Sequence, residues 1–216
     1  MPRIDDYKAA RALAVEELKK LNPKRIAALS RCEYFLEDRP QGVQEGIIVP
    51  YFGQDRLVRW PEVLVTVPDG GPEPPLTEQI LILHYLVNPT GEPLSGVRID
   101  FRQMPGGNFY WTAFVSRAKK PLLEAFGGDL EFYLRVAAQA GGVAQSLGDA
   151  SMEFSAFPLV PVTHVLWRGD EEFSPDANIL FDESIAGHLS TEDVAALAGA
   201  SVYRLMAAAR QMRQGG

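Results

Sequence analysis

The sequence predicts an α+β fold, in which an antiparallel strand cluster is flanked by helices and a long helix closes the chain. Three observations support this class. The 216 residues include 16 Pro and 19 Gly, so the chain has many turns. Short β-branched and aromatic runs between residues 47 and 67 favour strands, and the Ala-rich residues 191–212 have a helical pattern. Helices and strands are grouped and do not alternate regularly, so a parallel α/β sheet is not supported.

The first part of the chain is expected to form two helices and then a strand meander. Apolar residues recur at three- and four-residue steps over residues 5–21, which predicts an amphipathic helix. Asn22 and Pro23 are typical of a helix start, and a second short helix is expected through Leu29. Turn residues then separate the three expected strands, at residues 47–52, 56–60 and 63–67.

The rest of the chain is expected to contain four more helices and three more strands. Thr77 is predicted to cap a helix over residues 78–87, and Pro121 to break a helix over residues 109–126. The other expected elements are a strand at 97–102, a helix at 130–140, strands at 150–154 and 160–167, and a closing helix at 191–212.

We expect a single domain over residues 1–216. The Pro- and Gly-rich residues 69–75 form the most plausible internal boundary, but they are too few to argue for independent domains.

Composition excludes several kinds of protein. The single cysteine, Cys32, cannot form an internal disulfide, and alone it cannot hold a zinc ion or an iron–sulfur cluster, so no cofactor bound by cysteine ligation is expected. We interpret Cys32 as a small buried residue, with a reactive thiol as the alternative. The N-terminus has no apolar leader, and no stretch is long enough to span a membrane, so we expect a cytoplasmic protein without a membrane partner.

The excess negative charge is concentrated in one segment. Residues 170–193 contain eight acids and no Lys or Arg, whereas the remaining chain has 20 acids against 21 bases. No basic stripe for phosphate backbones is present, so we expect no nucleic-acid partner. The segment can be a solvated acidic loop in which Asp182 caps a helix, a docking face for a basic partner, or a cation site. The candidate residues for a partner or cation are Asp170, Glu171, Glu172, Phe173, Asp176 and Asp182.

A second candidate site lies at the turn of residues 105–111, where two glycines precede three aromatic residues. Glycines allow close approach of a ligand, and a helix N-terminus attracts anions. The glycine spacing matches no phosphate-binding or dinucleotide-binding motif. The alternatives are a tight turn whose aromatics fill the core, and a pocket for a planar or anionic molecule lined by Arg102, Phe109 and Trp111, with His84 or His164 nearby.

No catalytic motif is present in the sequence. His84, His164 and His188 are isolated from one another, and His84 and His164 lie in apolar segments, where a histidine is more often a core residue than a ligand. There is no nucleophile elbow, and the many carboxylates have no spacing that identifies an acid and a base. The sequence therefore predicts no catalytic residue and no metal ligand set.

Three stretches resemble a known family when they are taken together in this order: Thr-Glu-Gln-Ile-Leu-Ile-Leu-His-Tyr-Leu at 77–86, Phe-Arg-Gln-Met-Pro-Gly-Gly-Asn-Phe-Tyr-Trp at 101–111, and Leu-Trp-Arg-Gly-Asp-Glu-Glu-Phe-Ser-Pro-Asp-Ala-Asn-Ile-Leu-Phe-Asp at 166–182, followed by Ser-Thr-Glu-Asp at 190–193. The chain resembles the uncharacterised bacterial and archaeal family known as domain of unknown function 3786. The resemblance covers nearly the whole chain and is weakest before Cys32.

No activity is established for that family, so the resemblance implies more about fold than about chemistry. Family members occur in anaerobes, and some are fused to a cysteine-rich iron–sulfur module, of a kind also attached to corrinoid and acetyl-CoA pathway proteins; this sequence lacks the module. The resemblance implies a non-enzymatic accessory or binding protein of anaerobic iron–sulfur or corrinoid metabolism, with an iron–sulfur or corrinoid protein as partner. The acidic segment itself suggests a basic protein as partner. The alternative function is a small-molecule enzyme or sensor that uses the aromatic turn.

Overall fold

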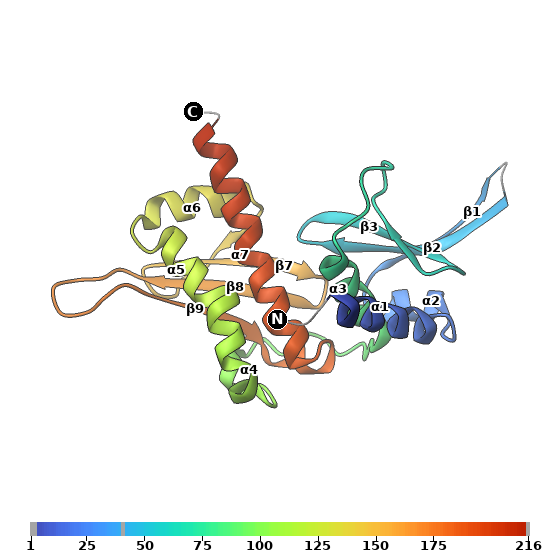
Figure 1. Cartoon of the computed structure of the whole chain (residues 1–216), viewed down its shortest axis with the longest axis horizontal. Helices are drawn as coiled ribbons and strands as arrows, with labels where there is room; N and C mark the ends of the chain where they lie inside the picture. The colour runs from blue at the N-terminus through green and yellow to red at the C-terminus, as the bar shows by residue number, and fades with distance from the viewer. Residues whose placement is uncertain (1–3, 40–41, 215–216) are drawn as a thin grey trace. The chain divides into compact units, whose positions relative to one another are not determined.

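The structure is a computed structural model that describes residues 4–39 and 42–214, and it contains two compact units (Figure 1). Unit 1 comprises Met1–Pro93, Phe157–Leu159 and Gly187–Leu189; unit 2 comprises Leu94–Ala156, Val160–Ala186 and Ser190–Gly216. Each unit combines helices with one antiparallel sheet, so the predicted α+β class is confirmed. The predicted boundary at residues 69–75 lies inside unit 1, and a single folding domain stays a prediction.

The helices of unit 1 are α1 (Ile4–Leu18), α2 (Pro23–Leu29) and α3 (Leu76–Val87). The predicted cap of α2 is confirmed, because the Asn22 side chain accepts a hydrogen bond from the amide of Arg25. The predicted cap at Thr77 is wrong. The carbonyl of Pro75 already accepts the amide hydrogen of Gln79, so Thr77 lies within the first turn and α3 begins at Leu76.

The sheet of unit 1 is an antiparallel meander in the order β1-β2-β3-β4. The predicted strands correspond to β2 (Gly42–Tyr51), β3 (Gln54–Trp60) and β4 (Leu64–Thr66), and β1 (Glu33–Arg39) was not predicted. Ile47, Val58 and Val65 form one cross-strand row on the inner face and are fully buried. On the same face the guanidinium of Arg56 pairs with Glu78, which joins the sheet to α3.

Tyr85 of α3 completes the core of unit 1. Its ring is stacked on Phe157, with ring centroids 4.4 Å apart. Its hydroxyl donates to the carbonyl of Ser30 at 2.7 Å and accepts from the amide of Leu159 at 3.3 Å. The connection between two strands of the later sheet thus supplies two core contacts of unit 1.

The sheet of unit 2 has the strand order β5-β9-β8-β7-β6. Its strands are β5 (Arg98–Asp100), β6 (Val143–Ala144), β7 (Ala150–Phe157), β8 (Val160–Trp167) and β9 (Asp176–Asp182). The structure has β8 with its predicted bounds and β7 three residues longer than predicted. A solvated loop was one of the three alternatives for the acidic segment, and it is wrong for residues 176–182, which form β9. Ala177, Ile179 and Phe181 are buried and alternate with the less buried Asp176, Asn178 and Leu180, as in a strand with one covered face.

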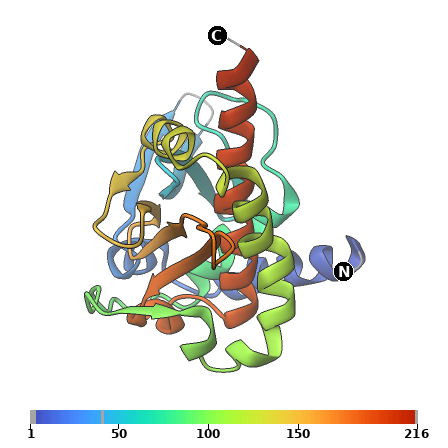
Figure 2. The same ribbon diagram turned by 90° about the vertical axis from the view of Figure 1, so that its left-hand side faces the viewer.

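The helices of unit 2 are α4 (Gly107–Phe114), α5 (Lys120–Phe126), α6 (Leu130–Gln139) and α7 (Thr191–Gln214), with 3-10 turns at Phe101–Gln103 and Glu183–Gly187. Figure 2 shows α7 running alongside α4 and α5. The closing helix predicted at 191–212 is confirmed.

The predicted break at Pro121 is replaced by a π-helical turn at Val115–Lys119, which links α4 directly to α5. Pro121 has no amide hydrogen to donate to the carbonyl of Arg117. The backbone widens before it, and the amide of Lys120 donates to the carbonyl of Val115 five residues earlier. The carbonyl of Arg117 instead faces Gly199 of α7, where a Cβ atom would lie 3.2 Å away. A glycine therefore allows α7 to approach the widened turn.

Within the described residues no helix is both long and apolar enough to cross a lipid bilayer.

Replacing Tyr85 with Phe is expected to destabilise the protein by about 1–3 kcal/mol, because the buried carbonyl of Ser30 and amide of Leu159 each lose a partner. Urea unfolding followed by circular dichroism measures the change. Tyr34→Phe is the control: this hydroxyl bonds Glu45 on the half-buried part of the β1–β2 hairpin, and its loss is expected to cost less than about 0.5 kcal/mol. Equal effects of the two variants would contradict the role given to Tyr85.

Candidate functional site

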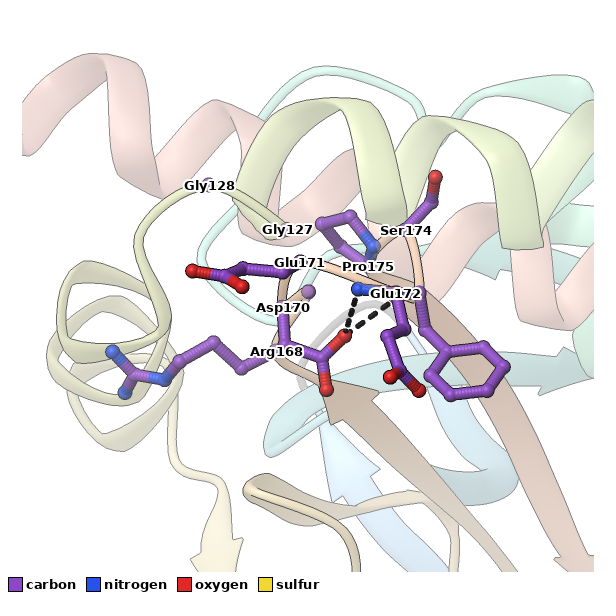
Figure 3. Close-up of a pocket in the computed structure, with 10 residues that line it drawn as sticks. Gly127, Gly128, Arg168, Asp170, Glu171, Glu172, Ser174 and Pro175 are labelled. Carbon is purple, nitrogen blue, oxygen red and sulfur yellow. Dashed lines mark hydrogen bonds between the residues drawn. The ribbon is translucent and has the colours of Figure 1, made fainter.

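The connection between β8 and β9, residues 168–175, is a self-supporting turn, which we call the acidic loop (Figure 3). The Asp170 carboxylate accepts hydrogen bonds from the amides of Glu172 at 2.8 Å and Phe173 at 2.7 Å. In return, the amide of Asp170 donates to the carbonyl of Phe173 at 2.9 Å. The two amide hydrogen bonds lower the pKa of Asp170, so its carboxylate stays ionised while it holds the turn.

The base of the acidic loop is narrow. A Cβ atom on Gly169 would lie 2.5 Å from Cδ of Pro175, so only glycine allows the two arms of the loop to come this close. The ring of Pro175 in turn fixes one backbone torsion of the returning arm. The two arms of the acidic loop are therefore in close contact at its base, and the hydrogen bonds of Asp170 fix the backbone at its tip.

A cavity of about 450 Å³ lies between the acidic loop and the turn that joins α5 to α6. In Figure 3 the side chains of Glu171 and Glu172 diverge from the loop backbone. The Phe173 side chain is 69 % exposed although it is large and apolar. The cavity is lined by Gly127, Gly128, Arg168, Gly169, Asp170, Glu171, Glu172, Phe173, Ser174 and Pro175.

Three other acids of residues 170–193 have partners inside unit 2, namely Asp176, Asp182 and Asp193. Asp176 at the start of β9 pairs with Lys119 of the π-helical turn at 3.0 Å. Asp193 and Ser190 exchange hydrogen bonds at the start of α7, as in a helix cap. Glu171, Glu172, Glu183 and Glu192 have no such partner among the residues that the structure describes, and Glu171 and Glu172 are the two that lie together in the acidic loop.

Asp182, at the end of β9, is a buried carboxylate that fixes neighbouring backbone. It accepts hydrogen bonds from the amides of Ser95, Gly96 and Ser184, at 2.8–3.0 Å, and from the hydroxyls of the two serines. Burial raises the pKa of Asp182, but these hydrogen bonds outweigh burial and lower the pKa to about 2. The bond to Ser184 caps the 3-10 turn that follows, as one of the sequence alternatives predicts for a helix.

The structure places a cation–π pair at the Gly-Gly turn. The Arg102 guanidinium lies 4.0 Å from the ring centre of Trp111, and the Phe109 side chain is 84 % exposed. The two glycines have backbone roles. Gly106 has φ of 74°, and a Cβ atom on Gly107 would lie 2.1 Å from the carbonyl oxygen of Phe101.

The three histidines lie on different elements. His84 is half-buried in α3 of unit 1, and the buried His188 of unit 1 has its ring 6.2 Å from that of Tyr85. His164 of β8 is fully buried in unit 2, and its Nε2 is 2.8 Å from the hydroxyl of Ser201 on α7. Ser201 donates to the carbonyl of Ala198, which leaves its oxygen to accept from Nε2 of His164.

His164 is held as a neutral imidazole. Burial lowers its pKa to about 3, and its Nδ1 has no hydrogen-bond partner in the part of the chain that the structure describes. Cys32 lies beside the end of α2, and burial raises the pKa of its thiol to about 11, which disfavours the reactive thiolate. Across residues 4–39 and 42–214, no three His, Cys, Asp or Glu side chains are grouped to hold a metal ion.

Sequence reasoning missed the residues that shape the acidic loop, namely Gly169, Pro175 and the Gly127–Gly128 pair. A signal for the first two was present, because apolar residues at every second position, 177, 179 and 181, favour a strand. With β8 before it, that strand would have defined a hairpin whose connection includes Gly169 and Pro175. Gly127 and Gly128 are 40 residues earlier, and no local pattern connects them to the loop.

The fold is that of an α+β protein, and its candidate site is an acidic hairpin connection. The model of an uncharacterised family, described as domain of unknown function (DUF3786), matches residues 22–204. The chain belongs to this family, as the sequence resemblance indicated. No curated protein and no solved structure matches the chain.

The two glycines of the Gly-Gly turn are expected to differ in their tolerance of alanine. Gly107→Ala places a Cβ atom against a backbone oxygen and is expected to cost more than about 2 kcal/mol. Gly106→Ala meets no atom within 4 Å and adds only the strain of a positive φ, about 1 kcal/mol. Thermal unfolding of both variants measures the difference, and equal losses would contradict the close approach at Gly107.

His164 is expected to make the protein less stable in mild acid. Its pKa is about 3 in the folded state and near 6.5 when unfolded, so the unfolded chain alone takes up a proton between these values. The contribution of His164 to stability is therefore fully present above pH 6.5. The free energy of unfolding falls by about 2 kcal/mol on going to pH 4.5. Urea unfolding at several pH values tests this. In the variant His164→Gln, the free energy of unfolding is expected to change less steeply with pH. An unchanged pH dependence would contradict the assignment of this effect to His164.

Proposed function

We propose that this protein is a non-enzymatic, cytoplasmic binding protein that docks a basic surface of a partner protein through its acidic loop. The observation that carries the proposal is a preformed turn that presents two structurally unused carboxylates, Glu171 and Glu172, beside the exposed ring of Phe173. The proposed partner is an iron–sulfur or corrinoid protein of anaerobic metabolism.

Preorganisation favours binding by this loop. A flexible loop loses conformational entropy when it binds, and that loss weakens the complex. Here the hydrogen bonds of Asp170 and the narrow base at Gly169 and Pro175 already restrict the backbone. Phe173 can then be buried by a partner with little further ordering, and an aromatic ring buries a large apolar area.

The charge of the loop favours a basic partner. Asp170, Glu171 and Glu172 are consecutive acids, and Arg168 is the one base that lines the same cavity. Like charges this close repel one another unless a cation or a basic surface approaches. Complementary charge mainly accelerates association, so binding is expected to weaken with added salt.

The acidic loop is favoured over a small-molecule pocket at the Gly-Gly turn. The Arg102 guanidinium is already placed on Trp111, the Phe109 ring is largely in solvent, and both glycines are required by the backbone. The link to anaerobic cofactor metabolism depends on the family resemblance, because some members of the family are fused to an iron–sulfur module. The docking geometry and the choice of partner are therefore separate parts of the proposal.

The proposal is tested with purified iron–sulfur and corrinoid proteins from the same organism, titrated against the full-length chain by biolayer interferometry. The double variant Glu171→Lys/Glu172→Lys is expected to weaken binding at least tenfold, which corresponds to about 1.4 kcal/mol. Phe173→Ala is expected to weaken binding, because it removes apolar contact. The salt dependence of binding is expected to stay the same, because no charge is changed.

The matched control is Glu62→Lys/Asp69→Lys, which makes the same change in net charge on exposed residues of unit 1. A specific docking site predicts that this control binds like the parent chain. Equal losses in both double variants would indicate a general charge effect and reject the acidic loop as the site. Binding of none of the purified proteins would reject the choice of partner.

A further inference from the structure

Three arginines of unit 2 lie where α6 packs against the C-terminal half of α7 (Figure 1). The guanidinium of Arg213, in the last turn of α7, lies 4.6 Å from the centre of the Phe132 ring. The guanidinium of Arg135, one turn after Phe132 on α6, lies 5.8 Å from the same ring centre. Arg210 is one turn before Arg213 on α7, and side chains at this spacing are neighbours. We call Arg135, Arg210 and Arg213 the arginine cluster.

The arginine cluster has no neutralising acid in the part of the chain that the structure describes. None of its guanidiniums forms an ion pair or a hydrogen bond with a residue at positions 4–39 or 42–214. Other basic side chains of unit 2 do have such partners. Lys119 pairs with Asp176 at 3.0 Å, and Arg98 pairs with an acid of β7 at the same distance. Three positive charges are therefore left together, and all three side chains are exposed.

Phe132 holds two of these guanidiniums near one point. Its ring is 9 % exposed, so it is fixed in the core while Arg135 and Arg213 reach it from two different helices. A cation–π contact uses the charge of a guanidinium and none of its N–H groups as hydrogen-bond donors. The donors of Arg135 and Arg213 therefore stay available to a ligand in solvent beside the ring.

Helix stability explains only part of the arginine cluster. A basic side chain in the last turn of a helix interacts favourably with the helix dipole, and Arg213 occupies such a position. Arg210 precedes the last turn of α7, and the last turn of α6, which follows Arg135, contains no basic residue. The dipole therefore accounts for one of the three arginines, and the convergence of Arg135 with Arg213 needs another explanation.

We propose that the arginine cluster binds the phosphate group of a small phosphorylated molecule. The planar guanidinium can donate two parallel hydrogen bonds to an oxyanion. A tetrahedral phosphate group has oxygens on more than one side, so it can accept such bonds from Arg135 and Arg213 together, whereas the two oxygens of a carboxylate lie on one side of its carbon. A phosphate monoester carries a charge of about −1.5 to −2 near neutral pH, which is enough to pair with both guanidiniums.

The binding is expected to depend on salt. The three arginines are exposed, and added salt screens the attraction between exposed charges. Arg210 adds a third positive charge beside Arg213, so it is expected to strengthen the attraction without contacting the ring of Phe132. Three charges suit one or two phosphate groups and are few for a nucleic-acid backbone, which is bound by a longer basic surface.

Isothermal titration calorimetry of pyrophosphate into the full chain, in a buffer of low ionic strength, tests the proposal. The double variant Arg135→Gln/Arg213→Gln is expected to bind pyrophosphate at least about tenfold more weakly than the parent chain, because both bidentate donors are lost. Arg213→Lys keeps the charge but cannot donate two parallel hydrogen bonds, so it is expected to weaken binding about threefold or more. Citrate, a carboxylate ligand of comparable charge, is expected to bind more weakly than pyrophosphate.

The matched control is Lys24→Gln/Arg25→Gln, which removes two positive charges from exposed neighbours on α2 of unit 1. This control is expected to bind pyrophosphate like the parent chain. Equal losses in the two double variants would indicate a general charge effect and overturn the proposal. If the arginines only stabilise the helices, Arg135→Gln/Arg213→Gln lowers the melting temperature and leaves pyrophosphate binding unchanged, which would also overturn it.

Two results with the parent chain decide the class of ligand. No heat of pyrophosphate binding, or equal affinity for citrate and pyrophosphate, would overturn the assignment to a phosphate group. Tighter binding of a single-stranded oligonucleotide than of pyrophosphate would indicate a nucleic-acid surface and overturn the assignment to a small molecule. Arg213→Lys serves if the double variant does not fold, which circular dichroism melting would reveal. None of these variants alters the acidic loop, so failure of this inference leaves the proposed docking function untouched.

Discussion

The contacts of Tyr85 determine how unit 1 is built. One side chain joins the end of α2, through Ser30, and the β7–β8 connection, through Phe157 and Leu159, to α3. These stretches are up to 129 positions apart in the sequence, and the loop-closure entropy of joining them must be offset by burial. Unit 1 is therefore incomplete until the strands of unit 2 have been synthesised, and the chain cannot be divided at Pro93 without opening the core of unit 1.

Local chemistry was sufficient to predict most of the elements. Asn22 beside Pro23 defines the start of α2, and an apolar run between turn residues defines β8. The strand β9 was missed because Asp176, Asn178 and Asp182 suggested solvated chain. Their alternation with buried Ala177, Ile179 and Phe181 is typical of a strand with one face covered. In this stretch the spacing of apolar residues indicates the strand, whereas the content of acidic residues does not determine the secondary structure.

Features that depend on pairing between distant residues were beyond sequence reasoning. The carbonyl of Arg117 lies against Gly199 because a proline widens the helix that contains Arg117 and because Gly199 has no side chain to keep α7 away. Neither residue reveals in the sequence that the other lies beside it. For the candidate site, the acids were found from composition, but the cavity needed Gly127 and Gly128 from another part of the chain.

The use of an aspartate at position 170 bears on what the acidic loop is for. A neutral asparagine can accept the same two amide hydrogen bonds and is equally common in such turns. It would also avoid repulsion with Glu171 and Glu172. The sequence instead has three consecutive acids, while Asp176, Asp182 and Asp193 in the same segment each have a partner inside unit 2. The charge at the loop tip exceeds what the turn requires for its shape, and an external basic surface would give that excess a function.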